Sequence, residues 1–317
     1  MALDPVSRAS ALALLTAGAA ALPLRALGQT APALRAGVES GAETFAELQY
    51  GAEAGIFARA GLNVVPSSFP TAGPIAAALA GGALDVGTID VILLANAVNR
   101  GVPLVAIAGS GLFRSKEPTS GLCVPASSSL RTAKQFEGLT IAVGTLSSLT
   151  SVSLRMWLAQ NGADPAKVQF VEMKFVEMPA ALQRGTVASA YLVEPLITQN
   201  SSQLRLIATP YSAIADTFPI SLIITTRAWL AQNAGTARRF VAAVYDTARW
   251  TNANRPQTAV MLSKYTQQDL DITRRMHRTE FATSLDAGPI QAVLDAASTN
   301  KLIDRPTNAA DLIARVG

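Results

Sequence analysis

Two stretches of the chain share one pattern, and this repetition constrains the fold more than any other feature of the sequence. Residues 78–90 (ALAGGALDVGTID) and 181–195 (ALQRGTVASAYLVEP) each run from a short helix through a glycine turn into an apolar strand with a polar end. Gly82 of the first stretch corresponds to Gly185 of the second. Each stretch lies late in its own series of alternating strands and helices. We therefore predict two similar α/β lobes, with a cleft between them where polar strand ends converge.

The first series of elements predicts a lobe built on parallel strands. Apolar runs that alternate with helical patterns indicate four strands, at residues 34–39, 62–69, 84–87 and 102–108. A strand-helix-strand order of this kind implies parallel strands joined by right-handed crossovers.

The second series predicts a second lobe and then a return to the first. Strands are expected at residues 122–124, 140–143, 168–171 and 187–193, with a helix at 149–160. We expect a strand at 204–208 to lead back to the first lobe, on which the helical C-terminal part of the chain would pack. The chain would then cross between the lobes near Ser110 and Gln203, and two crossings make a hinge. This assigns residues 29–110 and 204–317 to the first lobe and 111–203 to the second.

Composition excludes several function classes. The 317 residues are 50% hydrophobic and 15% charged, which suffices for two cores of ordinary domain size. The net charge of +4 comes from scattered Lys and Arg rather than from a basic stripe, so we expect no nucleic-acid partner. Cys123 is the one cysteine and His277 the one histidine, so an intrachain disulfide and a Cys/His metal cluster are both impossible. We read His277 as part of a polar helical segment, which does not favour a Ser-His-Asp triad. We expect no catalytic residue, no metal and no cofactor.

The first 28 residues have the pattern of a secretory signal peptide. Arg8 supplies a positive charge, residues 9–21 are small and apolar, and Ala26-Leu27-Gly28 matches a cleavage site, so a mature chain would begin at Gln29. The apolar run is too short to span a bilayer well, and no cysteine follows it for a lipid anchor. We therefore expect export to the periplasm. The alternative is a hydrophobic N-terminal helix of a cytosolic protein.

Five segments of the chain together resemble a known family. They are GAEAGIFARAGLNV (51–64), ALAGGALDVG (78–87), NRGVPLVAIAG (99–109), FEGLTIAVG (136–144) and ALQRGTVASAYLVEP (181–195). In this order and spacing they resemble the periplasmic substrate-binding proteins of ATP-driven importers in the nitrate/sulfonate/taurine group, which includes relatives that bind thiamine-precursor pyrimidines. The resemblance covers about residues 34–226. The chain departs from the family pattern at Ala188, where family members commonly have an Asp. At the corresponding position of the first lobe the acid is kept, as Asp85.

The resemblance implies a fold, a function and partners. The fold is the two-lobed periplasmic-binding-protein fold of type II, in which each lobe is a mainly parallel sheet flanked by helices. The function is that of a monomeric receptor, which closes on a small molecule and delivers it to the membrane permease of an ABC importer. Such proteins carry out no chemistry themselves.

Candidate ligand-binding residues follow the ends of the expected strands, because open α/β sheets bind ligands at the carboxyl ends of their strands. From the first lobe these are Glu39, Ser40, Thr44, Phe69, Thr71, Thr88, Asp90 and Ser110, and from the second they are Thr145, Ser147, Ser148, Tyr191 and Glu194.

The hydroxyls of residues 145–148 precede the helix at 149–160. Together with the free N–H groups of the helix N-terminus they can bind a carboxylate, sulfonate or phosphate oxygen, and Gly144 permits close approach. The alternative is an ordinary helix cap, in which Ser and Thr satisfy the helix's own donors.

The acids at strand ends can either contact a ligand or interact with groups of the protein itself. Glu194 can accept a hydrogen bond from an N–H group of a ligand, pair with Arg155 or Arg184, or cap the helix that begins at Pro195. Glu39 and Asp90 are candidates on the same grounds, and capping explains Asp90 equally well.

The candidate residues favour an organic ligand. Acids without an Arg or Lys at the strand ends argue against an inorganic anion such as nitrate or sulfate, which would need a cationic partner or many donors. Phe69 and Tyr191 can stack on a flat ring. We therefore expect a small polar organic ligand that is a sulfonate, a carboxylate or a nitrogen heterocycle.

Two other functions use the same fold. An enzyme of the menaquinone or thiamine-pyrimidine biosynthesis type would use paired acids such as Glu39 and Glu194 for acid/base chemistry. A sensor domain would present its ligand to a membrane kinase.

Overall fold

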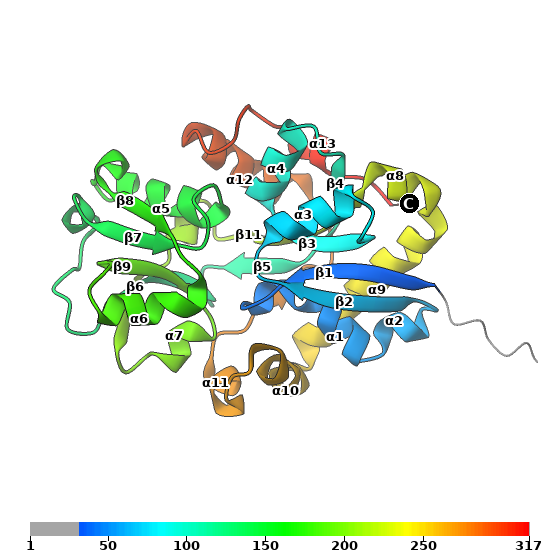
Figure 1. The fold of residues 1–317 in the computed structure, drawn as a ribbon, viewed down its shortest axis with the longest axis horizontal. Coiled ribbons are helices and arrows are strands. Elements are labelled where there is room, and N and C mark those ends of the chain that lie inside the picture. The colour runs from blue at the N-terminus through cyan, green and yellow to red at the C-terminus, as the bar shows by residue number, and fades with distance from the viewer. Residues whose placement is uncertain (1–31, 317) are drawn as a thin grey trace, which may run out of the picture. The chain divides into compact units, whose positions relative to one another are not determined.

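Two five-stranded sheets organise residues 32–316, the part of the chain that the computed structural model describes, and a three-stranded sheet links them along the chain (Figure 1). The expected signal peptide and its cleavage site lie outside the described residues. The prediction of two α/β lobes is confirmed, with one five-stranded sheet in each.

The first sheet has the strand order β2-β1-β3-β12-β4. Its strands are β1 (Ala33–Glu39), β2 (Asn63–Phe69), β3 (Val86–Asp90), β4 (Leu104–Gly109) and β12 (Ser221–Thr226). The pairs β1/β2 and β1/β3 are parallel, as expected, whereas β12 inserts antiparallel between β3 and β4. The third strand extends to Asp90 instead of ending at Gly87, because its ladder with β12 pairs Asp90 with Ser221.

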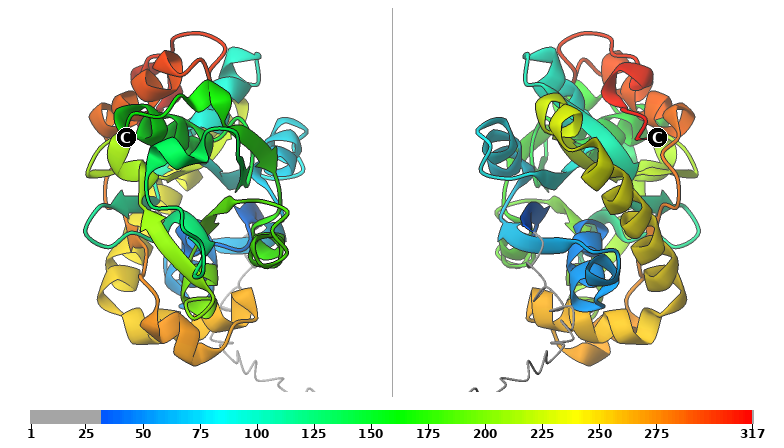
Figure 2. Two further views of the ribbon diagram at one scale, coloured as in Figure 1. Left: turned by 90° about the vertical axis from the view of Figure 1, so that its left-hand side faces the viewer. Right: turned by 90° about the vertical axis from the view of Figure 1, so that its right-hand side faces the viewer.

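Helices bury both faces of this sheet, because successive residues of a strand point to opposite faces. Leu104 and Ala106 pack with α3 (Ala72–Ala80), α4 (Val91–Asn99) and α12 (Ala287–Thr299). Val105 and Ile107 pack on the other face, with α1 (Glu47–Glu53), α2 (Ile56–Arg59) and α9 (Ala234–Ala253). The right-hand view of Figure 2 shows α9 crossing that face. Strands that are buried on both sides account for the nearly continuous apolar runs in the sequence.

The second sheet has the order β10-β6-β9-β7-β8. Its strands are β6 (Ser120–Pro125), β7 (Thr140–Val143), β8 (Gln169–Glu172), β9 (Ser189–Val193) and β10 (Leu204–Ala208). Helix α5 (Leu149–Gln160) covers one face and α6 (Met178–Gln183) covers the other, followed by α7 (Leu196–Gln199). The helix predicted at 149–160 has the same bounds in the structure.

One strand lies in a different lobe from the one we predicted. Leu204–Ala208 does not return the chain to the first lobe but pairs antiparallel with β6. Leu204 lies opposite Pro125, and Arg205 donates hydrogen bonds to the carbonyl oxygens of Ser128 and Leu130. These partners are far from the strand in sequence, so its apolar pattern alone could not identify its sheet.

The two repeated stretches occupy equivalent places in the two lobes. Gly82 turns the chain from α3 toward β3 with φ +71°, and Gly185 turns it from α6 toward β9 with φ +69°. Both values lie in the left-handed region, which glycine adopts without steric cost. The strand β3 ends at Asp90, and Glu194 directly follows the end of β9. The repetition therefore reflects one helix-turn-strand unit used twice.

A sheet of three short strands connects the lobes, and we call it the hinge sheet after the hinge predicted from the sequence. It consists of β5 (Gly111–Arg114) flanked by β11 (Thr217–Pro219) and β13 (Glu280–Phe281), both antiparallel to β5. The chain leaves the first sheet through β5, near Ser110 as predicted. It returns through β11 rather than near Gln203.

The C-terminal helices contact both lobes, although we expected them to pack on the first lobe alone. Helix α11 (Leu270–Arg275) contacts α7 of the second lobe, and α12 contacts both α4 and α5. His277 lies beyond the end of α11 rather than inside a helix. The remaining helices are α8 (Arg227–Gln232), α10 (Arg255–Thr266) and α13 (Ala309–Leu312), with 3-10 turns at Glu43–Phe45, Ala133–Phe136, Pro165–Lys167, Phe175–Glu177 and Pro210–Ala213. No helix within residues 32–316 has the length and apolar character that a membrane crossing requires.

Candidate functional site

Polar side chains from the two lobes meet at one place, which we call the junction cluster. It consists of Glu39 and Asp90 from the first lobe, Thr150 and Tyr191 from the second, and Tyr211 from the segment that returns between them. The tyrosine rings lie 5.3 Å apart between centroids. Three of these five residues, Glu39, Asp90 and Tyr191, were predicted as ligand-binding residues from their positions at strand ends.

The tyrosines of the junction cluster belong to a buried hydroxyl network. The Tyr191 hydroxyl lies 3.0 Å from Ser120 Oγ and also interacts with Ser153 of α5. The Tyr211 hydroxyl interacts with Thr150 and Tyr191. Burial raises the pKa of both phenols, so they stay protonated at neutral pH and can both donate and accept hydrogen bonds.

Glu39 and Asp90 form a coupled pair of acids. Burial, and then the charge of Asp90, raises the pKa of Glu39 to about 8. Burial raises the pKa of Asp90 to about 6, an increase limited by backbone N–H groups that include Leu93 of α4 at 2.8 Å and Leu149 of α5. At neutral pH Glu39 is therefore a neutral acid that can donate a hydrogen bond, whereas Asp90 carries a negative charge.

The polar groups of the loop before α5 form hydrogen bonds within the second lobe. Ser148 Oγ donates to the carbonyl oxygen of Thr145 at 2.7 Å, and Ser151 Oγ donates to the same oxygen at 3.1 Å. The Leu146 N–H group donates to Glu172, and Ser147 is exposed. The first N–H group of the helix faces Asp90 of the other lobe. A role for Thr145, Ser147 and Ser148 in ligand binding stays a prediction.

Glu194 acts as a cap in the structure, one of the alternatives that the sequence left open. Its two carboxylate oxygens accept from the Thr198 N–H group at 3.0 Å and from Thr198 Oγ1 at 2.9 Å, and the His277 N–H group also faces it. Arg155 does not pair with Glu194, since its guanidinium lies 4.5 Å above the Phe170 ring. These contacts occupy both oxygens of Glu194, so the cap alone explains its position.

Four of the other candidates lie within or shortly after β1, β2 and β3. Ser40 Oγ donates to the Phe69 carbonyl oxygen at 3.1 Å, and Thr71 is an exposed residue before α3. Thr88 is fully buried, and its Oγ1 accepts from the Glu39 N–H group at 3.3 Å, which ties the end of β1 to β3.

The last two candidates, Thr44 and Ser110, lie beside the hinge sheet instead of in the junction cluster. The Thr44 carbonyl oxygen accepts from Ser221 Oγ at 2.7 Å, and Ser110 faces the buried Glu47. Ligand contact by these residues also stays a prediction.

Sequence reasoning missed Thr150 and Tyr211. Thr150 is the second residue of α5, so a search that included helix first turns as well as strand ends would have found it. Tyr211 follows Pro210 in a 3-10 turn between two strands. Nothing in its local sequence signals that it reaches the other elements of the cluster.

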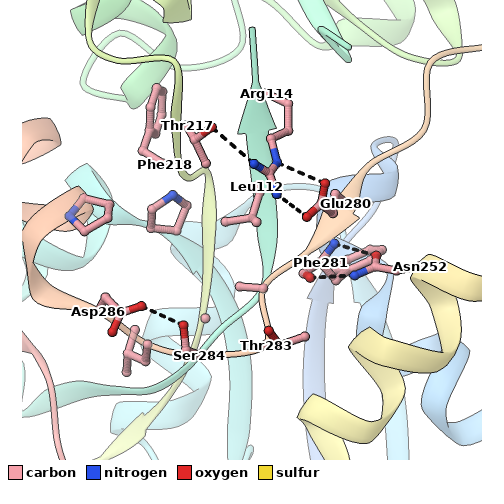
Figure 3. A pocket seen from close by; sticks show the side chains of 15 residues that line it. Leu112, Arg114, Thr217, Phe218, Asn252, Glu280, Phe281, Thr283, Ser284 and Asp286 are labelled. Atoms are coloured by element: carbon pink, nitrogen blue, oxygen red, sulfur yellow. Dashed lines mark hydrogen bonds and ion pairs between the residues drawn. The ribbon is translucent and has the colours of Figure 1, made fainter. Parts of the chain in front are cut away.

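Two cavities lie away from the predicted residues. One, of about 230 Å³, lies against the hinge sheet, where Arg114 pairs with Glu280 and Ser284 donates to Asp286 at 2.6 Å (Figure 3). The other, of about 260 Å³, lies beside Asp85 at the opposite end of β1 from Glu39. Neither is lined by a predicted ligand-binding residue. Within residues 32–316, no three His, Cys, Asp or Glu side chains are grouped as a metal ion would need.

Residues 42–264 match the model of the NMT1-like family, and this span is more than half of the chain. The protein is a member of the NMT1-like family. No curated protein sequence gives a significant match.

Several solved structures are similar to this protein in fold. The alkanesulfonate-binding protein SsuA of Xanthomonas axonopodis pv. citri has a TM-score of 0.75 at 17% identity, over 91% of this chain and 100% of its own. The periplasmic nitrate-binding protein NrtA of Synechocystis PCC 6803 has a TM-score of 0.72 at 17% identity, over 90% of this chain and 86% of its own. The desulfurization enzyme DSZB has a TM-score of 0.67 at 14% identity, over 89% of this chain and 96% of its own. The resemblance seen in the sequence is thereby confirmed in family and fold.

Proposed function

We propose that this NMT1-like protein is the solute-binding receptor of an ATP-driven importer, and that it holds a small polar organic ligand at the junction cluster. The observation that carries the proposal is the meeting of acids from the first lobe with hydroxyls of the second at the carboxyl ends of β1, β3 and β9. Ligands of open α/β sheets bind at this place. Closure about the hinge sheet would exclude water from the ligand, and the closed lobes would be recognised by a membrane permease.

The chemistry of the cluster supports an organic ligand. A neutral Glu39 offers one donor and one acceptor, Asp90 offers a charged acceptor, and the tyrosines offer hydroxyls beside aromatic faces. A flat compound with N–H groups, such as a nitrogen heterocycle, would use all of these. Sulfonates and carboxylates belong to the same proposal on the strength of the family resemblance.

The proposed cellular context follows from the same argument. A monomeric receptor would work in the periplasm, where the fold neighbours described as periplasmic act, and a signal peptide within residues 1–28 would send it there. This can be checked by assaying periplasmic and cytosolic fractions of the host for the protein.

Screening by thermal shift, followed by calorimetric titration, tests the receptor function directly. The mature chain would be screened against heterocycles, sulfonates, carboxylates, nitrate and sulfate. A rise in Tm with an organic compound and none with nitrate or sulfate would support the proposal. A response to inorganic anions alone would contradict it.

Tyr211→Phe locates the site within the molecule. The substitution removes one hydroxyl and keeps the ring, so we expect about tenfold weaker binding of the compound found by the screen, which corresponds to one lost hydrogen bond. Tyr265→Phe is the matched control, because Tyr265 bonds Glu53 and the Gln49 carbonyl oxygen on the surface of α1. Equal affinities for the two variants would place the ligand elsewhere.

An enzyme is the second candidate function, because DSZB shares the fold. The acids Glu39 and Asp90 would then carry acid/base chemistry. Cys123 is buried between the second sheet and α6, and His277 lies outside the junction cluster, so neither would act as a nucleophile or base there. Mass spectrometry of a bound compound after long incubation separates the two functions, since a receptor returns it unchanged.

A further inference from the structure

The N-terminus of α5 is occupied by an acid from the other lobe. The side chain of Ser148, the N-cap residue, makes no cap hydrogen bond to the helix, because its hydroxyl turns back to Thr145. The N–H group of Leu149, the first helical residue, instead faces the carboxylate of Asp90. Asp90 is itself only 8% exposed, so this contact is shielded from water.

Asp90 serves two helices at once. It accepts from the Leu93 N–H group at 2.8 Å as the N-cap of α4, and its carboxylate also faces the first turn of α5. A helix N-terminus carries a partial positive charge and free N–H donors, so it attracts an anion. At α5 of this protein the anion is the carboxylate of Asp90.

The acids beside the N-terminus of α5 make the binding of a second anion there unfavourable. The acidic groups that act on Tyr211 are Asp90 and Glu39, and Asp90 is the charged group that acts on Glu39. An anionic ligand beside α5 would meet the negative charge of Asp90 at close range, in surroundings where burial weakens the screening by water. A neutral or cationic ligand would meet acceptors and a neutral acid.

We propose that Asp90 determines ligand specificity by filling the place that a sulfonate, sulfate or carboxylate would take at the N-terminus of α5, so that the site selects neutral or cationic compounds with N–H donors. This inference rests on the proposed receptor function and narrows its ligand class. The ligand class inferred here would differ from the alkanesulfonate and nitrate named for two of the fold neighbours.

Two substitutions at Asp90 separate the effect of its charge from the effect of the space that its side chain fills. Asp90→Asn removes the charge and still fills the place, whereas Asp90→Ser removes the charge and leaves room for an oxyanion. Asn and Ser are both good N-cap residues, so either variant keeps a cap for α4. Asp286→Ser is the control, because it makes the same substitution at the N-cap position of another helix, α12, where the side chain accepts from Ser284 outside the junction cluster.

The probes are methanesulfonate and sulfate, measured by thermal shift and calorimetric titration. We expect no response from the wild type or from Asp286→Ser, and an affinity for methanesulfonate at least about tenfold higher in Asp90→Ser, with Asp90→Asn between them. A wild type that binds methanesulfonate as tightly as Asp90→Ser overturns the inference, and so does a folded Asp90→Ser that gains nothing. If Asp90→Ser does not fold, Asp90→Asn decides by the same criteria.

The same data separate this inference from the receptor function. A wild type that binds an anion in the cluster contradicts the role of Asp90 but agrees with a receptor. A wild type that binds no compound of the screen, while Asp90→Ser gains methanesulfonate, supports the role of Asp90 and contradicts the receptor.

Discussion

At the scale of single residues, one buried carboxyl outside the junction cluster lacks hydrogen-bond partners for both of its oxygens. Glu47 of α1 is fully buried, and neither of its oxygens has a hydrogen-bond partner of normal geometry. The Glu47 carboxyl faces the hydroxyl of Ser110, where the chain leaves the first sheet, and that hydroxyl also lacks a hydrogen bond of normal geometry. Burial raises the pKa of Glu47 well above its usual range, so the folded protein holds it neutral.

This buried acid predicts a pH dependence of stability. Because the pKa is higher in the folded state than in the unfolded state, the folded state binds more protons, and the free energy of unfolding falls as pH rises above about 4.3, the unfolded value. Glu47→Gln removes that loss. We expect the variant to exceed the wild type in stability by more at pH 8 than at pH 5, on the order of 1–3 kcal/mol at pH 8.

Urea unfolding at the two pH values measures this difference. Glu177→Gln, at an exposed ion pair with Lys174, serves as the control and should change little. The same pH slope in the wild type and in Glu47→Gln would show that Glu47 does not titrate in this way.

At the scale of elements, a buried ion pair fastens the C-terminal segment to the start of the first lobe. Glu43 is 2% and Arg278 7% exposed by side chain, and Arg278 Nε lies 2.8 Å and 2.9 Å from the two Glu43 oxygens. Tyr50 and the Thr279 N–H group also donate to Glu43, and Arg278 donates to Thr258. Because Thr279 directly precedes β13, the network fixes the position of this strand of the hinge sheet.

Breaking one side of this pair should be strongly destabilising. Arg278→Met leaves the Glu43 charge buried without its partner, so we expect a loss of about 3–5 kcal/mol in the free energy of unfolding. The double variant Glu43→Gln/Arg278→Met should recover part of that loss. Arg249→Met, at the exposed pair with Asp246, should cost no more than about 1 kcal/mol. Chemical unfolding of the wild type and the three variants tests the set, and a double variant that is no more stable than Arg278→Met would contradict the coupling.

At the scale of the whole described chain, the two lobes are connected by the hinge sheet and also by contacts of the C-terminal helices. The hinge sheet joins the lobes through β5 and β11, while α11 and α12 contact the second lobe as well as the first. Any closing motion therefore has to move these helices too. A close backbone approach at Gly111 sets where β5 leaves the first lobe.

Gly111→Val tests this approach. A Cβ at Gly111 would lie 2.5 Å from Thr44 Cγ2 and 2.6 Å from the Thr44 carbonyl oxygen, so β5 has to shift. We expect a loss of about 1–3 kcal/mol in stability and a weaker response to the compound found by the screen, because the lobes can no longer meet at the junction cluster. Gly235→Ala, in open space in the first turn of α9, should instead stabilise by up to about 1 kcal/mol. Thermal unfolding with and without the compound measures both effects, and normal binding by Gly111→Val would show that β5 does not govern closure.

Local patterns in the sequence determined the elements of this protein. Helix α5 begins after Ser148 and ends before Asn161, and the turns at Gly82 and Gly185 precede the two corresponding strands, because caps, glycine turns and apolar periodicity act within a few residues. The same patterns placed Glu39, Asp90 and Tyr191 at strand ends, which on parallel sheets face a common edge.

Tertiary structure alone decided which elements are partners. β10 joined the second sheet, Tyr211 joined the junction cluster, and the carboxylate of Asp90 came to face Leu149 of the other lobe. Strand pairing and the partner of a helix N-terminus depend on groups that lie far apart in the sequence. Any free N–H or carbonyl group can satisfy them, so local residue patterns do not distinguish among the possible partners.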